Sequence, residues 1–169
     1  NNTAQLGGVF YVTGNTTASL YVDQCEFTDS VAPMGGAVFY TSTSHSAPGN
    51  FTFLSSNFSR NVANNGIGGV LSANTLGGSQ FLQVTECVLK DNIALNGGVF
   101  GLDFTQTTPQ NVTMRDNIFH NSSATNGGVI YIQNRQSTVG LVVEMDLLFN
   151  LSNNNITDPT ATSSGGLAY

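Results

Sequence analysis

A glycine pair followed by an apolar residue recurs six times along this 169-residue chain, and this repeat most constrains the fold. The pairs begin at Gly7, Gly35, Gly68, Gly97, Gly127 and Gly165. Their spacings are 28, 33, 29, 30 and 38 residues. Repeats of this length are typical of solenoids and propellers, in which one unit cannot bury its apolar face alone and stacks on its neighbours.

A second motif precedes each later glycine pair. It consists of an aromatic residue or Leu, two further residues, and then Ser or Asn. Its first positions are Phe27, Phe58, Leu89 and Phe119, with a degenerate copy at Phe149. Its polar positions are Ser30, Asn61, Asn92, Ser122 and Ser152. Two motifs in a fixed order across the whole chain carry far more information than a single glycine pair.

Short runs of alternating apolar residues within each unit predict β-strands. In the first unit these runs are Val9–Val12, Leu20–Val22 and Cys25–Phe27. Three short strands in about 30 residues describe one coil of a parallel β-solenoid. The Leu-x-x-Leu-x-Leu pattern of leucine-rich repeats is missing, and a propeller blade needs about 40 residues. We therefore predict an all-β chain of about five coils of roughly 30 residues each, with three strands per coil.

Stacking gives each recurring position a physical role, because equivalent residues lie about 4.8 Å apart along the axis. The aromatic positions are predicted to form an inward core column: Phe27, Phe58, Leu89, Phe119 and Phe149. A second inward column is Leu20, Phe51, Leu82 and Val112, and a third is Phe10, Val38, Leu71, Phe100 and Ile130. The polar positions are predicted to form a structural ladder at a corner: Ser30, Asn61, Asn92, Ser122 and Ser152. Stacked Asn side chains can bond turn backbone or one another there, and Asn117 is assigned the same kind of role.

The two cysteines fall in one column, with Ser56 between them. Cys25 and Cys87 are then two coils apart, about 9–10 Å, whereas a disulfide needs Cα atoms within about 7 Å. We predict that they do not bridge each other and are buried free thiols. The alternative is that each pairs with a Cys outside this segment.

The amino-acid composition argues against two classes of function, nucleic-acid binding and membrane insertion. Asn, Ser and Thr make up 55 residues, while only 8 % are charged and the net charge is −6. Four scattered cations cannot neutralise many phosphates, so no nucleic-acid partner is expected. No stretch approaches the roughly 20 apolar residues of a membrane helix, so no membrane insertion is expected in this segment.

N-glycosylation acceptor motifs are about twice as frequent as the roughly four that chance would give. Besides Asn1, they are Asn15, Asn50, Asn57, Asn111, Asn121, Asn150 and Asn155. A polar composition that creates them accidentally is the alternative reading. The preferred reading is a eukaryotic, secreted or cell-surface chain whose partners are N-linked glycans and other copies or segments of one surface assembly.

The combination of Gly-Gly-Ala/Val-apolar with Phe-x-x-Asn resembles the repeats of chlamydial polymorphic membrane proteins. Similar repeats occur in large surface proteins of unicellular eukaryotes. The resemblance covers the whole chain, with Ser in place of Asn at Ser30, Ser122 and Ser152, and Leu89 in place of Phe. It implies a right-handed parallel β-helix with an adhesive or surface-structural role, and it transfers no catalytic residue.

The repeat also predicts which residues lie on the outside of the solenoid. Asp29, Arg60 and Asp91 are expected to stack with alternating sign. Val88, Ile118 and Leu148 are expected to form an outward apolar stripe suited to lateral association, unless the register is misread. The connection 152–166 is predicted to protrude as a loop, and 1–169 is treated as one β-helix segment, either part of a longer solenoid or a subunit that stacks end to end.

No catalytic or metal site and no cofactor is predicted. His45 and His120 lie far apart in the repeat and lack partners at metal-ligand spacing. Asp23, Glu86 and Asp116 can approach one face near Arg115, but they come from different positions in their coils. The sequence thus predicts a structural, non-enzymatic glycoprotein of a surface fibre, filament or coat. An adhesin region that binds a receptor or glycan, and a non-catalytic part of a polysaccharide-degrading β-helix, are the alternatives.

Overall fold

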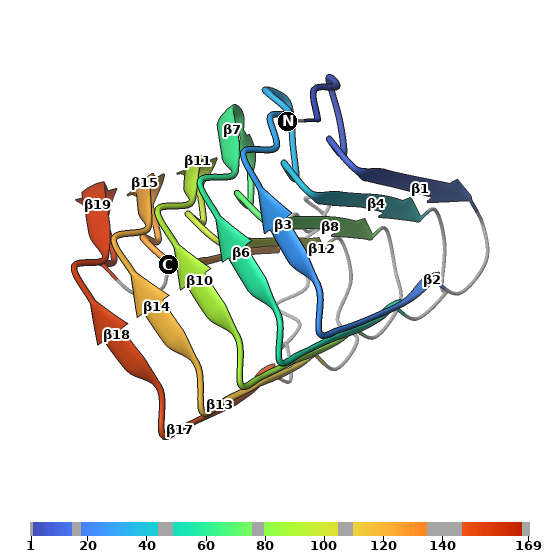
Figure 1. The fold of residues 1–169 in the computed structure, drawn as a ribbon. Helices are drawn as coiled ribbons and strands as arrows, with labels where there is room; N and C mark the ends of the chain where they lie inside the picture. Colours follow the sequence, from blue (N-terminus) through green and yellow to red (C-terminus); the bar gives the residue numbers. More distant parts are fainter. Residues whose placement is uncertain are drawn as a thin grey trace, which may run out of the picture.

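The chain folds as a parallel β-solenoid in which successive coils lie side by side along one axis (Figure 1). The computed structural model describes residues 2–14, 18–43, 49–75, 80–104, 110–134 and 147–166. Every strand pairing among these residues is parallel, and they contain no helix. The predicted all-β parallel solenoid is confirmed.

Four parallel sheets form the walls. Sheet I contains β1 (Phe10–Gly14), β4 (Phe39–Thr43), β8 (Leu71–Thr75), β12 (Phe100–Phe104) and β16 (Ile130–Asn134). Sheet II contains β2 (Ala18–Asp23), β5 (Gly49–Leu54), β9 (Gln80–Thr85), β13 (Gln110–Arg115) and β17 (Leu147–Ser152). Sheet III contains β3 (Glu26–Thr28), β6 (Asn57–Ser59), β10 (Val88–Lys90), β14 (Ile118–His120) and β18 (Asn155–Thr157). Sheet IV contains β7 (Val62–Ile67), β11 (Ile93–Asn96), β15 (Ser123–Asn126) and β19 (Thr160–Ser164).

The prediction of three strands per coil was therefore one strand short. The additional strands are those of sheet IV, between the polar corner and the glycine pair. β7 reads Val-Ala-Asn-Asn-Gly-Ile and β15 reads Ser-Ala-Thr-Asn, so the apolar alternation that marks a strand is absent. Before β7, bridges between Thr3, Val31 and Val62 extend this sheet toward the N-terminal end.

Single residues with positive φ form three corners in each coil. One corner uses glycine, at Gly7, Gly36, Gly68, Gly97, Gly127 and Gly165. A Cβ on Gly68 would lie 1.9 Å from the carbonyl oxygen of Leu71, so this position requires glycine. The other two corners use non-glycine residues with φ between 43° and 56°: Gln24, Ser55, Glu86, Asp116 and Asn153, then Asp29, Arg60, Asp91, Asn121 and Asp158. Asn and Asp tolerate this conformation better than most side chains.

Inward columns of apolar side chains fill the solenoid. Phe58 is fully buried, stacks on Phe27 with ring centroids 5.3 Å apart, and meets Phe53 edge-on at 5.5 Å. The backbone register confirms the column Phe27, Phe58, Leu89 and Phe119. It also confirms the second column through Leu20, Phe51, Leu82 and Val112. Small side chains face one another in sheet IV, where Ala63 pairs with Ala94 and Ala124 pairs with Ala161.

The last unit was misassigned from the sequence. Phe149 pairs with Val112 in sheet II, and Ile156 takes the position next to Phe119. Ser152 correspondingly pairs with Arg115 and is not a member of the ladder. The predicted protruding loop 152–166 is wrong as well, because β18 and β19 occupy most of it. Phe149 and Ser152 have the spacing of the Phe-x-x-Asn motif by chance. The structurally equivalent segment begins at Ile156 and has neither the Phe nor the Asn of the motif.

At the second glycine pair, the corner lies one residue later than at the other pairs. Positive φ falls on Gly36, the second glycine of its pair, but on the first glycine of the others. The strand that follows is displaced accordingly, so Phe39 and not Val38 pairs with Phe10 and Leu71.

Candidate functional site

The polar ladder lies at the corner between sheets III and IV, and Asn61 and Asn92 are its centre. Both are fully buried. The Asn61 side-chain amide donates to the carbonyl oxygen of Phe27 at 3.1 Å and to Asn92 Oδ1 at 3.0 Å, while its own Oδ1 accepts the backbone N–H of Ser30 at 3.1 Å. Asn92 Oδ1 also accepts the backbone N–H of Asn61, and its amide donates to the carbonyl of Phe58 at 2.9 Å. The Asn61 side chain thus bonds the corner of the preceding coil and the equivalent Asn of the following coil.

Ser30 and Ser122 occupy the ends of this ladder. Both are buried, and their hydroxyl oxygens have no hydrogen-bond partner. The serine positions do not continue the amide chain, because neither hydroxyl bonds to the neighbouring coil. The ladder prediction is therefore confirmed for its two Asn members, and the serines act as small corner residues.

A second ladder lies at the corner between sheets II and III. The Asn117 amide donates to Asn154 Oδ1 and to the carbonyl of Val84, both at 2.9 Å, and Asn117 Oδ1 accepts the N–H of Cys87 at 2.9 Å. Asn154 in turn donates to the carbonyl of Met114. The sequence pointed to Asn117 but missed Asn154. Asn154 could have been found from its position, because each member of this ladder lies two residues before a residue of the core column.

The two cysteines belong to this second ladder and are free thiols. Cys87 is buried, and burial raises the pKa of its thiol. Cys25 is exposed, which corrects the prediction that both are buried. It lies at the N-terminal end of the solenoid, where no described coil covers it. Its Sγ lies 3.1 Å from the carbonyl oxygen of Asp23.

The described acceptor asparagines all lie on the outside of the solenoid. Asn50, Asn111 and Asn150 are on sheet II, Asn57 and Asn155 on sheet III, and Asn121 at the neighbouring corner. Asn111 and Asn57 are partly buried and the others are exposed. No described strand of sheet I or sheet IV carries an acceptor. Asn1 and Asn15 lie outside the described residues.

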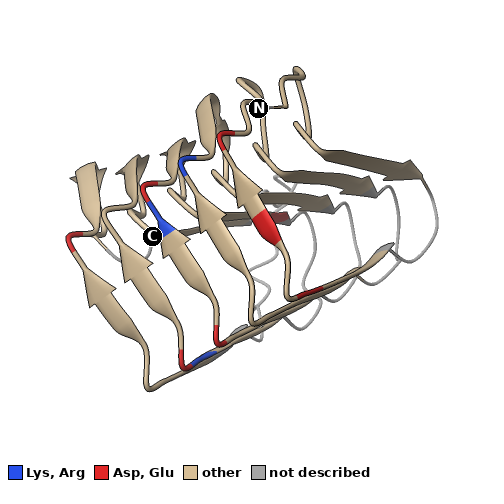
Figure 2. Cartoon of the chain, in the orientation of Figure 1, with Lys and Arg blue, Asp and Glu red and all other residues tan. Residues whose placement is uncertain are grey.

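Most of the charged residues described lie at or next to the corners of the solenoid (Figure 2). Arg60 makes two hydrogen bonds to Asp29, at 2.7 and 2.8 Å. The Arg60 guanidinium lowers the pKa of the Asp29 carboxyl, chiefly by hydrogen bonding. Asn121 donates to Asp91 at 2.8 Å on the same corner. These groups are exposed, so the expected charge stack is present but contributes little to stability.

The carboxylates considered for catalysis are spread along another corner. Glu86 accepts a hydrogen bond from Ser55, and Asp116 accepts one from Arg115 at 2.8 Å. Asp23 lies at the end of β2, two strands away from Thr85 in the same sheet. The three acids follow the solenoid axis on its exterior and do not converge on a cleft.

His120 is the only described histidine, and its Nδ1 lies 2.8 Å from Thr157 Oγ1. Asp158 lies 3.9 Å from the same nitrogen. Within the described ranges no group of three or more His, Cys, Asp or Glu residues is arranged to hold a metal ion. Likewise, those ranges contain no helix that could span a membrane. His45 lies outside them.

The outward apolar stripe is shorter than expected. Val88 and Ile118 are neighbours on sheet III with about 38 % and 46 % of their surface exposed. Leu148 is not part of this stripe, because it pairs with Asn111 in sheet II. Asn57 and Asn155, both acceptor residues, flank the stripe instead.

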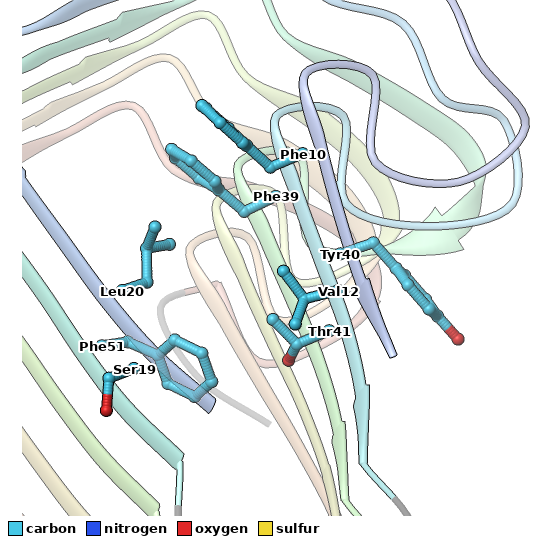
Figure 3. A pocket seen from close by; sticks show the side chains of 8 residues that line it. All are labelled: Phe10, Val12, Ser19, Leu20, Phe39, Tyr40, Thr41 and Phe51. Carbon is cyan, nitrogen blue, oxygen red and sulfur yellow. The ribbon is translucent and has the colours of Figure 1, made fainter. Parts of the chain in front are cut away.

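The N-terminal end of the solenoid is an apolar surface. Phe10 stacks on Phe39 at 5.3 Å and remains 47 % exposed. A cavity of about 50 Å³ opens between sheets I and II here, lined mainly by Phe10, Val12, Leu20 and Phe51 (Figure 3). Among the described strands, β1, β2 and β3 each have a partner on one side only. This end therefore combines exposed core side chains with unpaired strand edges.

Comparison with known proteins adds no further constraint: no family model, no curated protein and no solved structure matches the chain.

Proposed function

We propose that this chain is a building block of an extracellular fibre, filament or coat, formed by a parallel β-helix that carries N-linked glycans. The observation that carries the proposal is the N-terminal end of the solenoid. There the edges of β1, β2 and β3 and the side chains of Phe10 and Val12 are open to solvent. An open strand edge is a template for another strand.

The occupant that fits this end is another parallel coil, from the same chain or from another copy. The core columns present Phe10, Leu20 and Phe27 to it, at the spacing that the coils already use. Contacts between unlike ends repeat without closing, and they generate linear assemblies. The role of the chain is then mechanical: backbone ladders along the axis, an apolar interior, and outer faces free for association.

The repeat pattern supports a surface setting for the same assembly. The Gly-Gly and Phe-x-x-Asn motifs resemble those of polymorphic membrane proteins, and the structure gives both motifs structural positions, at a glycine corner and an amide ladder. The acceptor asparagines face outward on sheets II and III, where attached glycans would not disturb the core. We propose no catalytic activity and no cofactor for this segment.

A second candidate function is adhesion to a receptor or glycan. The observation that favours it is the outward stack of Tyr11 on Tyr40, with ring centroids 5.5 Å apart on sheet I. Exposed tyrosines are common in recognition surfaces. Sheet I also has no described acceptor asparagine, so glycans on the described sites would leave this face open.

Cryo-electron microscopy of the native source material tests the proposal. A regular ladder of about 4.8 Å that continues past the edge of β1 would support a fibre or longer solenoid. An isolated domain whose N-terminal end is covered by an unrelated cap would contradict it and make the adhesin reading the better one. A receptor and glycan binding screen, with Tyr11→Ser as the matched variant, would then follow.

A mass measurement before and after glycosidase treatment tests the glycoprotein part separately. Loss of mass at one or more of the acceptor sites is expected. No mass change at any site would remove the secreted, N-glycosylated reading.

A further inference from the structure

One outward column of sheet II alternates acceptor asparagines with large apolar residues. It runs through Ser19, Asn50, Phe81, Asn111 and Leu148 on successive strands. Phe81 is 45 % exposed and Leu148 is 62 % exposed. Asn111 lies between them, at one strand spacing of about 4.8 Å from each. Asn111 thus has an exposed apolar side chain on the strand to either side of it.

The acceptor motif at Asn111 is already arranged on the outer face. Asn111 and Thr113 point to the same side of β13, since alternate residues of a strand share a face. The Thr113 hydroxyl donates to Asn111 Oδ1 at 3.3 Å. This contact uses the side-chain oxygen and not the amide nitrogen, which is the atom that carries an N-glycan.

A depression in the surface begins at this amide. It encloses about 240 Å³ and is lined by Phe81, Leu82, Gln83, Asn111 and Thr113. Its floor combines an aromatic ring from β9 with amide and hydroxyl groups from β9 and β13. Asn50 lies on the other side of Phe81, and the depression does not extend to it.

We infer that Asn111 carries an N-linked glycan whose first N-acetylglucosamine lies in this depression, over the ring of Phe81. A pyranose ring has an apolar face of C–H bonds that packs on an aromatic side chain, and its hydroxyl and acetamide groups match Gln83 and Thr113. The inference rests on the proposed secreted, glycosylated state. It adds that this glycan is part of the folded surface and covers the exposed ring of Phe81 on sheet II.

The attachment itself is the ordinary transfer from a lipid-diphosphate-linked oligosaccharide by the transferase of the secretory pathway. The Asn111 amide nitrogen forms a bond to C1 of the sugar and loses one proton to the enzyme's base. The bond between C1 and the lipid diphosphate oxygen breaks, and the diphosphate leaves with the electron pair. No oxidation or reduction is involved.

The test uses the chain secreted from eukaryotic cells, in four forms: unsubstituted, Phe81→Ser, Asn111→Gln and the double variant. We expect glycan at Asn111 by site-resolved mass spectrometry. We expect Phe81→Ser to lower the melting temperature by about 2–4 °C when Asn111 is glycosylated and by less than half of that in the Asn111→Gln background. Tyr11→Ser is the matched control, because Tyr11 is an exposed aromatic residue on a face without a described acceptor; its effect should be equal in both backgrounds.

A second readout does not depend on stability. Amidase release of the glycan from the folded protein should be several-fold slower at Asn111 than at the exposed corner residue Asn121, and Phe81→Ser should remove this difference. Equal release rates, or an equal effect of Phe81→Ser in both backgrounds, would overturn the inference. So would an unoccupied Asn111 beside occupied sites elsewhere, which would leave the proposed function intact. Glycan at no site at all would overturn both.

Discussion

Replacing Asn61 by Asp changes one buried amide of the ladder to a carboxyl group of the same shape. The Asn61 Nδ2 group donates to the Phe27 carbonyl at 3.1 Å and to Asn92 Oδ1 at 3.0 Å. After the substitution, a carboxylate oxygen would face both acceptors at these distances, in a position with no solvent exposure. The bond from the Ser30 N–H to Oδ1 can persist.

An uncompensated buried charge of this kind costs about 3–5 kcal/mol. At about 2–4 °C per kcal/mol for a chain of this size, Asn61→Asp should lower the melting temperature at pH 7 by roughly 6–20 °C. The matched control is Asn64→Asp, which adds the same charge at an exposed position of β7, the strand that begins just after Asn61. That variant should shift the melting temperature by no more than about 2 °C, since exposed substitutions are usually worth less than 0.5 kcal/mol.

The loss should also depend on pH, with a defined sign. Burial beside two acceptors raises the pKa of the new carboxyl above the roughly 3.9 of an unfolded Asp. The folded state then binds more protons, so stability falls as the pH rises from about 4 through the raised pKa. Below pH 4 the protonated carboxyl can again donate one hydrogen bond. Circular-dichroism melts from pH 3 to pH 8 measure this; equal melting temperatures of Asn61→Asp and Asn64→Asp at pH 7 would refute the role assigned to the ladder.

Three further predictions address the core, the surface pair and the thiols. Phe58→Ala should destabilise the fold by roughly 3–5 kcal/mol in a denaturant titration, because its ring is fully buried among aromatic neighbours; an unchanged midpoint would contradict the inward column. Arg60→Ala should leave the melting temperature almost unchanged but raise the pKa of Asp29 toward its ordinary value, as measured by carboxyl NMR. In the unsubstituted protein, the Asp29 carboxylate stabilises the fold at a pH above its unfolded pKa, and this stabilisation is lost as the pH falls through its lowered folded pKa. Cys25 should react with a thiol reagent in the folded protein, whereas Cys87 should react only after unfolding; equal rates would contradict the burial assigned to the second ladder.

Most of the architecture could be read from the repeat, because a position that must be glycine or must be apolar in one coil is constrained in the same way in the next. Phe27, Phe58, Leu89 and Phe119 were placed correctly on that basis. The failures have local causes. At Phe149 a chance Phe-x-x-Ser match competed with the true position of Ile156, and spacing alone could not decide between them. The strands of sheet IV were not predicted because sequences such as Ser123–Asn126 of β15 lack apolar alternation. These strands nevertheless pair in parallel with their neighbours, as the other strands do.

The outward residues were predictable only in part. Alternation along a strand indicates that the acceptor asparagines lie outside, but it does not predict which residues lie beside them on the neighbouring strands. Asn111 and Phe81 are 30 residues apart in sequence and adjacent in sheet II. The exposure of Cys25 depends on its place at the end of the stack, which the column pattern does not encode.

The distance along the chain between stacked residues shapes how this molecule folds. Ladder contacts join residues 30 or 31 apart in the earlier coils and 37 apart at the last one. Loop-closure entropy grows only with the logarithm of loop length, so the longer closure costs only about 0.2 kcal/mol more. Every coil after the first pair is therefore added at nearly the same entropic cost, onto an edge that is already ordered. During synthesis, each of these units can therefore pair its strands as soon as it and a neighbouring unit have both emerged, and the stack then grows by one coil at a time.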